Sequence, residues 1–178
     1  QQFNSLTLSM SEEIISALKA FEQNPEVKVI VLGATGKAFC TGMELSSSLF
    51  QDVDNIDLGL VIEKYFKPMI DLILNIPKII ICAVNGTAAG AGASISLLCD
   101  ISIAAKSASF TQIFSKMGLI PDGGATWFLP RMIGFAKAKA LMLTAEKVSA
   151  EEAERLGMIY KVVDDDLLQQ EVEKLAEY

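Results

Sequence analysis

The clearest indication of the fold class is the segment Ile79-Ile-Ile-Cys-Ala-Val84-Asn-Gly86-Thr-Ala-Ala-Gly90-Ala-Gly92-Ala-Ser94. Its first six residues form a short β-branched run, which is typical of a buried strand, and Asn85-Gly86 is a turn signal. The small residues that follow predict the start of a buried helix over 90–98. Because strand, turn and helix follow one another directly, the segment predicts an α/β protein.

The rest of the chain repeats this order of strand and helix. Thr7 is expected to cap a helix over 8–23, because apolar residues recur there at helical spacing until Asn24-Pro25 stops them. The other predicted strands are 28–32, 101–104 and 158–163, the other predicted helices are 56–74, 126–129, 135–143, 150–156 and 167–178, and residues 34–49 are expected to be a loop. No linker or repeat divides the chain, so we expect one domain over residues 1–178, truncated at both ends.

The composition argues against several classes of protein. A formal net charge of −7 and a pI of about 4.6 disfavour a nucleic-acid partner, which would require a basic stripe. No uninterrupted apolar run approaches the ~18–20 residues of a membrane span. The cysteines Cys40, Cys82 and Cys99 are odd in number and lack metal-ligand spacing. We therefore expect a reduced, cytoplasmic protein with no metal site and no membrane partner.

The chain contains no histidine. Ser-His-Asp and Cys-His triads are thereby excluded, as are zinc sites built on histidine. Any acid–base chemistry must therefore be carried out by carboxylate, lysine, tyrosine or cysteine side chains.

Two glycine-containing loops follow predicted strands. In residues 86–94, backbone N–H groups near the positive end of a helix can face an anion or a developing oxyanion, although tight packing of a helix on a sheet explains the small residues equally well. A dinucleotide-binding fingerprint fails, because its third glycine would fall at Ile95. The second loop, 39–45, bends at Gly42, so the Met43 amide can be a further donor, although most such turns are only turns. Two donors of this kind are what an oxyanion hole needs.

Asp122 is the candidate acid–base residue. It stands between Pro121 and two glycines in an apolar stretch, where a carboxylate can keep a raised pKa and act as a base. The local sequence alone favours a structural role, in which Asp122 caps a helix that begins at Gly123.

The motifs of the chain resemble those of the enoyl-CoA hydratase/isomerase (crotonase) family. They are Lys37-Ala-Phe-Cys-Thr-Gly-Met-Glu-Leu45, Ala83-Val-Asn-Gly-Thr-Ala-Ala-Gly-Ala-Gly92 with Cys99-Asp100-Ile101, Gly118-Leu-Ile-Pro-Asp-Gly-Gly-Ala-Thr126 with Leu129-Pro-Arg131, and Ser149-Ala-Glu-Glu-Ala-Glu-Arg-Leu-Gly157 before Val162-Val163-Asp164. The resemblance covers nearly the whole chain in the same order. It implies a crotonase-type spiral of ββα units, an acyl-CoA thioester substrate and a homotrimer or hexamer. The family's first strand and its helical C-terminal trimerisation region are expected to be missing from this chain.

Carried over position by position, the resemblance implies an oxyanion hole made by the amides of Met43 and Ala91, where Ala91 replaces a common glycine. The two glutamates of the hydratases fall at Ser94 and Phe114, so neither carboxylate needed for hydration is present. Asp122 stands where the double-bond isomerases of the family carry their single acid. Residues 118–122 look particularly like the ring-epoxide phenylacetyl-CoA isomerases of bacterial phenylacetate degradation. The implied activity is isomerisation by proton transfer through a thioester enolate, with no cofactor besides the CoA of the substrate.

The residues expected around the site can each be interpreted in two ways. Ser94, Phe110, Phe114 and Trp127 are predicted to line the acyl pocket, although aromatic residues in an apolar chain are more often core. The CoA phosphates have candidate partners in Lys37, Lys64 and Lys67, for which solvated surface is the simpler interpretation.

Three alternatives to an isomerase remain at this point. One is an enoyl-CoA hydratase, and another is a haloaroyl-CoA dehalogenase-like enzyme in which Asp122 attacks an aromatic ring. The third, from another class, is a non-catalytic acyl-CoA-binding protein.

Overall fold

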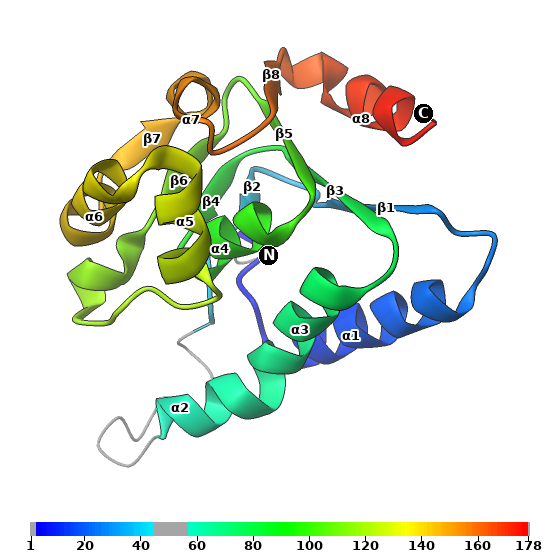
Figure 1. The fold of residues 1–178 in the computed structure, drawn as a ribbon, viewed down its shortest axis with the longest axis horizontal. Coiled ribbons are helices and arrows are strands. Elements are labelled where there is room, and N and C mark those ends of the chain that lie inside the picture. Colours follow the sequence, from blue (N-terminus) through cyan, green and yellow to red (C-terminus); the bar gives the residue numbers. More distant parts are fainter. Residues whose placement is uncertain (1–2, 45–56, 178) are drawn as a thin grey trace.

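The computed structural model describes residues 3–44 and 57–177, which form two four-stranded sheets surrounded by helices (Figure 1). The first sheet has the order β1 (Val29–Gly33), β3 (Ile79–Val84), β5 (Ile101–Ala105) and β8 (Lys161–Val163), and all its pairs are parallel. The second has the order β2 (Ala38–Cys40), β4 (Thr87–Ala89), β6 (Ser109–Thr111) and β7 (Lys147–Ser149), of which only β7 is antiparallel to its neighbour.

Each passage of the chain contributes one strand to each sheet. A short turn links β1 to β2, β3 to β4 and β5 to β6, and a longer segment with a helix then leads to the next pair. The turn after β3 requires glycine, because a Cβ on Gly86 would overlap the carbonyl oxygen of Lys37. The chain is therefore a spiral of ββα units, as the resemblance predicts.

Helices cover the outside of the spiral and one helix fills its centre. They are α1 (Leu8–Gln23), α2 (Leu58–Val61), the π-helical turn η2 (Ile62–Phe66), α3 (Lys67–Asn75), α4 (Ala91–Leu98), the 3₁₀ turn η3 (Ile113–Met117), α5 (Ala125–Ile133), α6 (Phe135–Thr144), α7 (Ala150–Leu156), the 3₁₀ turn η4 (Asp165–Leu167) and α8 (Leu168–Ala176). Helices α1 and α3 pack side by side (Figure 1). Every residue of α4 after the first is buried, so α4 is the central helix.

The structure confirms most predicted elements and corrects others. Thr7 caps α1 by accepting a hydrogen bond from the Met10 N–H, and β3 has the predicted bounds. The predicted loop 34–49 contains β2 in its described part, while residues 45–49 lie outside the described residues. The predicted helix 56–74 is divided by η2, and the last strand begins at Lys161 rather than at Met158.

The core is continuous from the central helix to the inner faces of both sheets. The three cysteines belong to this region and are buried free thiols, for example Cys82 at 0% exposure. Burial raises the pKa of the Cys82 thiol well above its usual value. Among the described helices, none combines the length and the apolar composition needed to cross a bilayer.

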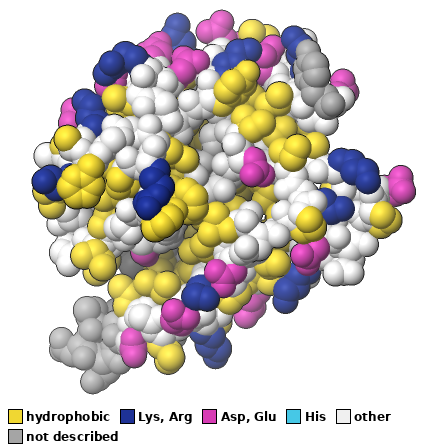
Figure 2. Space-filling view, viewed as in Figure 1, with side chains coloured by type: hydrophobic (Ala, Val, Ile, Leu, Met, Phe, Trp, Pro, Cys, Tyr) yellow, Lys and Arg dark blue, Asp and Glu magenta, His cyan; other side chains and the backbone are white. Residues whose placement is uncertain are grey.

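Hydrophobic side chains gather on the surface over α5 and α6 (Figure 2). Phe135 and Leu143 are each 69% exposed, and Ile120 in the loop before α5 is 84% exposed. The Arg131 guanidinium lies 3.2 Å from the centre of the Trp127 ring, a cation–π contact on this surface.

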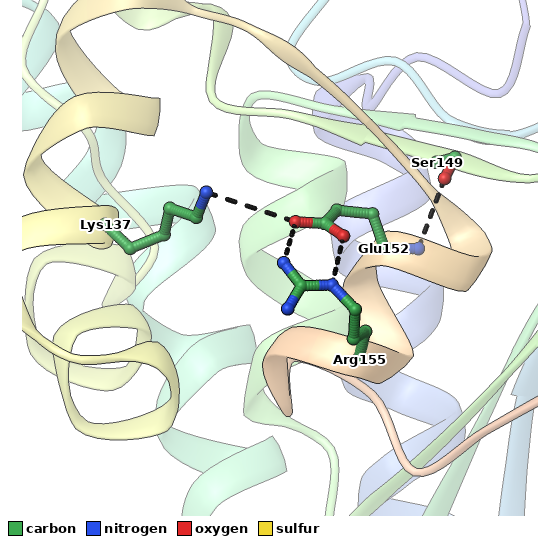
Figure 3. A network of polar contacts seen from close by, with 4 residues as sticks. All are labelled: Lys137, Ser149, Glu152 and Arg155. Atoms are coloured by element: carbon green, nitrogen blue, oxygen red, sulfur yellow. Dashed lines mark hydrogen bonds and ion pairs between the residues drawn. The ribbon is translucent and has the colours of Figure 1, made fainter.

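A polar network joins α6 to α7 (Figure 3). Arg155 donates two hydrogen bonds to the Glu152 carboxylate, at 2.6 and 2.7 Å, and the Lys137 ammonium lies 4.0 Å from the same group. Arg155 also lowers the pKa of Glu152. The Ser149 hydroxyl accepts a hydrogen bond from the Glu152 N–H and so caps α7. Because the charged groups are exposed, the cap should contribute more to stability than the ion pairs.

We predict that Ser149→Ala lowers the free energy of unfolding by about 1 kcal/mol, because the first turn of α7 loses its capping acceptor. Arg155→Ala serves as the matched comparison and should cost only a few tenths of a kcal/mol. Urea denaturation of both variants measures the difference. A larger loss in Arg155→Ala would mean that the ion pairs dominate.

Candidate active site

A parallel bridge between Leu6 and Met43 fixes the first loop of the site. The Leu6 N–H donates to the Gly42 carbonyl at 2.7 Å, and the Leu6 carbonyl accepts from the Glu44 N–H at 2.9 Å. In a parallel pairing the residue between these two partners directs its own N–H to the opposite side. The Met43 amide therefore faces away from Leu6 and is available to a ligand.

The Ala91 amide is the second available donor. Ala91 is the first residue of α4, where a backbone N–H has no acceptor within the helix. The preceding Gly90 has φ 52° and ψ −126°, a conformation restricted almost entirely to glycine. Its N–H donates to the Thr111 carbonyl at 2.9 Å, so β6 fixes the point at which α4 begins.

Two glycines, Gly42 and Gly92, bring these amides together, because the backbone of the loop after β2 can contact the backbone at the start of α4 directly. A Cβ placed on Gly42 would lie 3.5 Å from the Ala91 nitrogen and 3.2 Å from the Ala89 carbonyl oxygen. A Cβ on Gly92 would overlap the carbonyl group of Cys40. The loop after β2 therefore packs directly against the start of α4, and the amides of Met43 and Ala91 belong to one surface.

Asp122 lies in the loop before α5, in mostly apolar surroundings. Loss of hydration raises the pKa of its carboxyl group from 3.8 to about 6, while its own backbone amide lowers the pKa by a smaller amount. Within the described part of the chain, its Oδ1 atom is buried and has no hydrogen-bond partner. The reading of Asp122 as a helix cap is wrong, because Gly124 occupies the cap position and Asp122 contributes only its backbone carbonyl, 3.1 Å from the Ala125 nitrogen.

Three predicted site residues, Met43, Ala91 and Asp122, line one small cavity of about 20 Å³. Its remaining lining consists of Gly123 and of apolar side chains, namely Leu6, Ile62, Phe66, Met69, Ile70 and Ile95. Asp122 is the one ionisable side chain among these lining residues. The cavity thus combines a carboxylate of raised pKa with two backbone donors, which is the equipment for moving a proton next to a developing oxyanion.

None of the four predicted acyl-pocket residues lines this cavity, and their contact with an acyl group stays a prediction. The Ser94 hydroxyl donates to the Gly90 carbonyl at 3.2 Å inside α4, and the Ser94 side chain lies so close to Gly123 that a Cβ there would come within 2.9 Å of the Ser94 Cβ. The Phe110 side chain is core, at 1% exposure, and Phe114 packs beside Gly90. Trp127 is 58% exposed, on the outer surface.

Two of the lysines considered for the CoA phosphates, Lys64 and Lys67, have partners at the surface, which agrees with the simpler interpretation of solvated surface residues. Lys67 donates to Asp71 at 2.9 Å, and the Lys64 ammonium lies 5.1 Å from the centre of the Tyr65 ring. Neither lines the cavity of Asp122 or the larger cavity beside it. A larger cavity of about 740 Å³, bordered by Asn4 and Asn85, shares Leu6, Met69 and Ile95 with the cavity of Asp122.

The apolar lining of the small cavity was not found from the sequence. Ile62, Phe66, Met69 and Ile70 recur at helical spacing, which is also the pattern of an ordinary buried helix face. Only the position of Pro68 within this segment signalled an irregular turn.

Comparisons with known proteins show what this chain is similar to. The sequence model described as enoyl-CoA hydratase/isomerase matches residues 1–178. The 1,2-epoxyphenylacetyl-CoA isomerase of Escherichia coli K12 is 41% identical over 100% of this chain and 68% of its own length. A probable enoyl-CoA hydratase of Rhodobacter capsulatus is also 41% identical, over 91% of this chain and 61% of its own length.

A solved structure that is similar to this chain carries a related name. The crystal structure of an enoyl-CoA hydratase from Bacillus anthracis superposes with a TM-score of 0.89 at 34% identity, covering 99% of this chain and 67% of that one. The chain thus spans about two thirds or less of the length of these relatives.

We predict that Gly92→Ala lowers the free energy of unfolding by about 3 kcal/mol or more, because the new methyl group overlaps the Cys40 carbonyl and must displace backbone. Ala91→Gly is the control, since it keeps the amide and should cost less than about 1 kcal/mol. Thermal and urea unfolding compare the two variants. Equal losses would show that the contact between the loop and α4 is not tight.

We also predict a pH-dependent difference in stability between the wild type and Asp122→Asn. The folded carboxyl keeps its proton up to about pH 6, whereas the unfolded one ionises near 3.8, so the stability contributed by this group is present at low pH and is lost as the pH rises through 6. From pH 3.5 to pH 8 the wild type should lose up to ~3 kcal/mol relative to the variant. Denaturation at several pH values measures this difference, and a constant difference would contradict it.

Proposed function

Because the chain belongs to the enoyl-CoA hydratase/isomerase family, we propose that the whole protein is an acyl-CoA isomerase. It moves a double bond, or opens a ring, by transferring a proton at the acyl group of a CoA thioester. The observation that carries this proposal is the cavity in which Asp122 is the one ionisable side chain beside the free amides of Met43 and Ala91.

The proposed reaction is a 1,3-proton shift. Asp122 removes a proton from the acyl chain, and the amides of Met43 and Ala91 stabilise the thioester oxygen as it becomes an enolate. Protonated Asp122 then returns the proton two carbons away, so the carboxylate is regenerated, the isomerised product is neutral at the reacting carbons, and the total charge is unchanged. With a pKa of about 6 the carboxyl group is largely ionised at neutral pH and is a stronger base than an exposed aspartate.

The two backbone donors supply the electrostatic part of catalysis. One donor in an oxyanion hole typically contributes roughly 3 kcal/mol to the stabilisation of the transition state. Since the packing of Gly42 and Gly92 fixes both donors before the substrate binds, they need little reorganisation during the reaction. No metal or further cofactor enters this mechanism.

A ring-containing substrate is the finer form of the proposal. The similarity to a 1,2-epoxyphenylacetyl-CoA isomerase supports it, together with the sequence of residues 118–122. In this form of the reaction, removal of the proton by Asp122 would accompany opening of the epoxide to an enlarged oxygen heterocycle. The protein would then act in phenylacetate degradation.

Hydration is the second candidate function, because several relatives are named as hydratases. Adding water to a double bond in this family requires two carboxylates, and the corresponding positions hold Ser94 and Phe114. Both side chains are buried outside the lining of the cavity. These observations favour isomerisation. A dehalogenase-like reaction at Asp122 would leave a covalent aspartyl ester, and a pure binding protein would leave no chemical change.

We further propose that the whole protein is a cytoplasmic homotrimer or hexamer. The exposed hydrophobic side chains over α5 and α6 supply a surface suited to contacts between subunits (Figure 2).

The test is NMR of a 3-enoyl-CoA in D₂O with the whole protein and with its Asp122→Asn variant. We expect double-bond migration and deuterium uptake in the wild type and a rate at least ~100-fold lower in the variant, because the proton carrier is lost. Formation of a 3-hydroxyacyl-CoA would identify a hydratase. Binding of both 3-enoyl-CoA and ring-epoxide thioesters without reaction would contradict the proposal and leave a binding protein.

A further inference from the structure

The wall of the cavity near Asp122 contains an irregular turn of helix. The Lys67 N–H bonds to the Ile62 carbonyl, five residues earlier, so η2 is a π-helical turn between α2 and α3. Turns of this kind are rare and occur frequently at functional sites. Both end residues of η2, Ile62 and Phe66, line the cavity that contains Asp122.

The sequence provides a physical cause for this turn. Pro68 is the second residue of α3, and proline in a regular helix clashes with the carbonyl group four residues before it, here that of Lys64. A wider π turn directly before the proline moves this carbonyl away. One extra residue in a turn also rotates the preceding segment by about 100° relative to an unbroken α-helix. The direction of Ile62 relative to α3 therefore depends on the π turn.

The chemistry of the wall defines what can lie against it. Phe66 is 4% exposed and Met69 is 1% exposed, and together with Ile62, Ile70 and Leu6 they present only apolar groups. The free volume of about 20 Å³ is close to that of one water-sized molecule. An acyl group larger than this needs more room beside Asp122, and Phe66 is the largest apolar side chain that limits this room.

We infer that Phe66, held in place by the π turn that precedes Pro68, determines the size of the apolar acyl group that fits beside Asp122. This inference rests on the proposed function, because it assumes that the cavity receives the acyl part of a thioester. Phe66 is a specificity-determining residue, and Pro68 is a positioning residue that acts through it.

The experiment measures binding of two unreactive thioesters, butyryl-CoA and phenylacetyl-CoA, to the whole protein by calorimetry. In Phe66→Ala the ratio of Kd for phenylacetyl-CoA to Kd for butyryl-CoA should fall at least ~10-fold relative to the wild type, since removal of the ring makes room for the larger group. Phe66→Leu should shift the ratio in the same direction and guards against loss of folding in the alanine variant.

The matched control is Tyr65→Leu, which changes an aromatic residue of the same turn that does not line the cavity. Its ratio should stay within about twofold of the wild type. Pro68→Ala should change the ratio although Phe66 is intact, because the restored N–H permits an ordinary α-helical turn. An unchanged ratio in both Phe66 variants would overturn the inference, and an unchanged ratio in Pro68→Ala would overturn the role of the proline.

This readout separates the two proposals. Because neither thioester has to react, a shifted ratio in a protein that exchanges no deuterium would support the selectivity of Phe66 and reject the isomerase. Deuterium exchange with an unshifted ratio would support the isomerase and reject the selectivity of Phe66. Failure of the wild type to bind either thioester would overturn both.

Discussion

The site depends on one packing constraint, the direct contact of two backbone segments at the end of the second sheet. The loop after β2 lies on the start of α4 with no side chain between them, because Gly42 and Gly92 have no Cβ to separate the segments. Hydrogen bonds of Leu6 hold the loop from one side, and the bond from Gly90 to Thr111 holds the helix from the other. The positions of both donor amides follow from this contact, so the geometry of the site is a property of the backbone.

The first sheet could be predicted from the sequence and the second could not. Strand β3 has six residues with a continuous apolar run, and such a run is distinctive because both faces of a parallel strand are buried. The strands of the second sheet have three residues each, too few to show any alternation. They are stabilised by packing against helices, since β2 and β4 contact α4 and β6 and β7 contact α7. The predicted helix 56–74 differs from the structure for another reason: periodicity predicted one regular helix, and the steric effect of Pro68 introduces the π-helical turn η2.

The proximity of the polar groups in the candidate site could be predicted, whereas the apolar lining beside them could not. Asp122, Met43 and Ala91 were placed by the resemblance of their motifs to a family, and the cavity brings them together. Phe110 and Trp127 were predicted as pocket residues because aromatic residues often line pockets, yet the first is core and the second is at the surface. Nothing in local sequence distinguishes an apolar side chain that lines a cavity from one that fills a core, since both follow the same periodicity.

The isolation of Asp122 bears on how this scaffold can evolve. In the described structure its buried Oδ1 has no partner, so exchanging the residue breaks no hydrogen bond of that atom and removes the cost of burying a charge. The amides that we propose to bind the thioester oxygen belong to a different part of the chain and do not depend on the side chain of Asp122. A single substitution at Asp122 can therefore silence the proposed chemistry while the fold and the two donor amides persist, so loss of activity need not be accompanied by loss of the architecture.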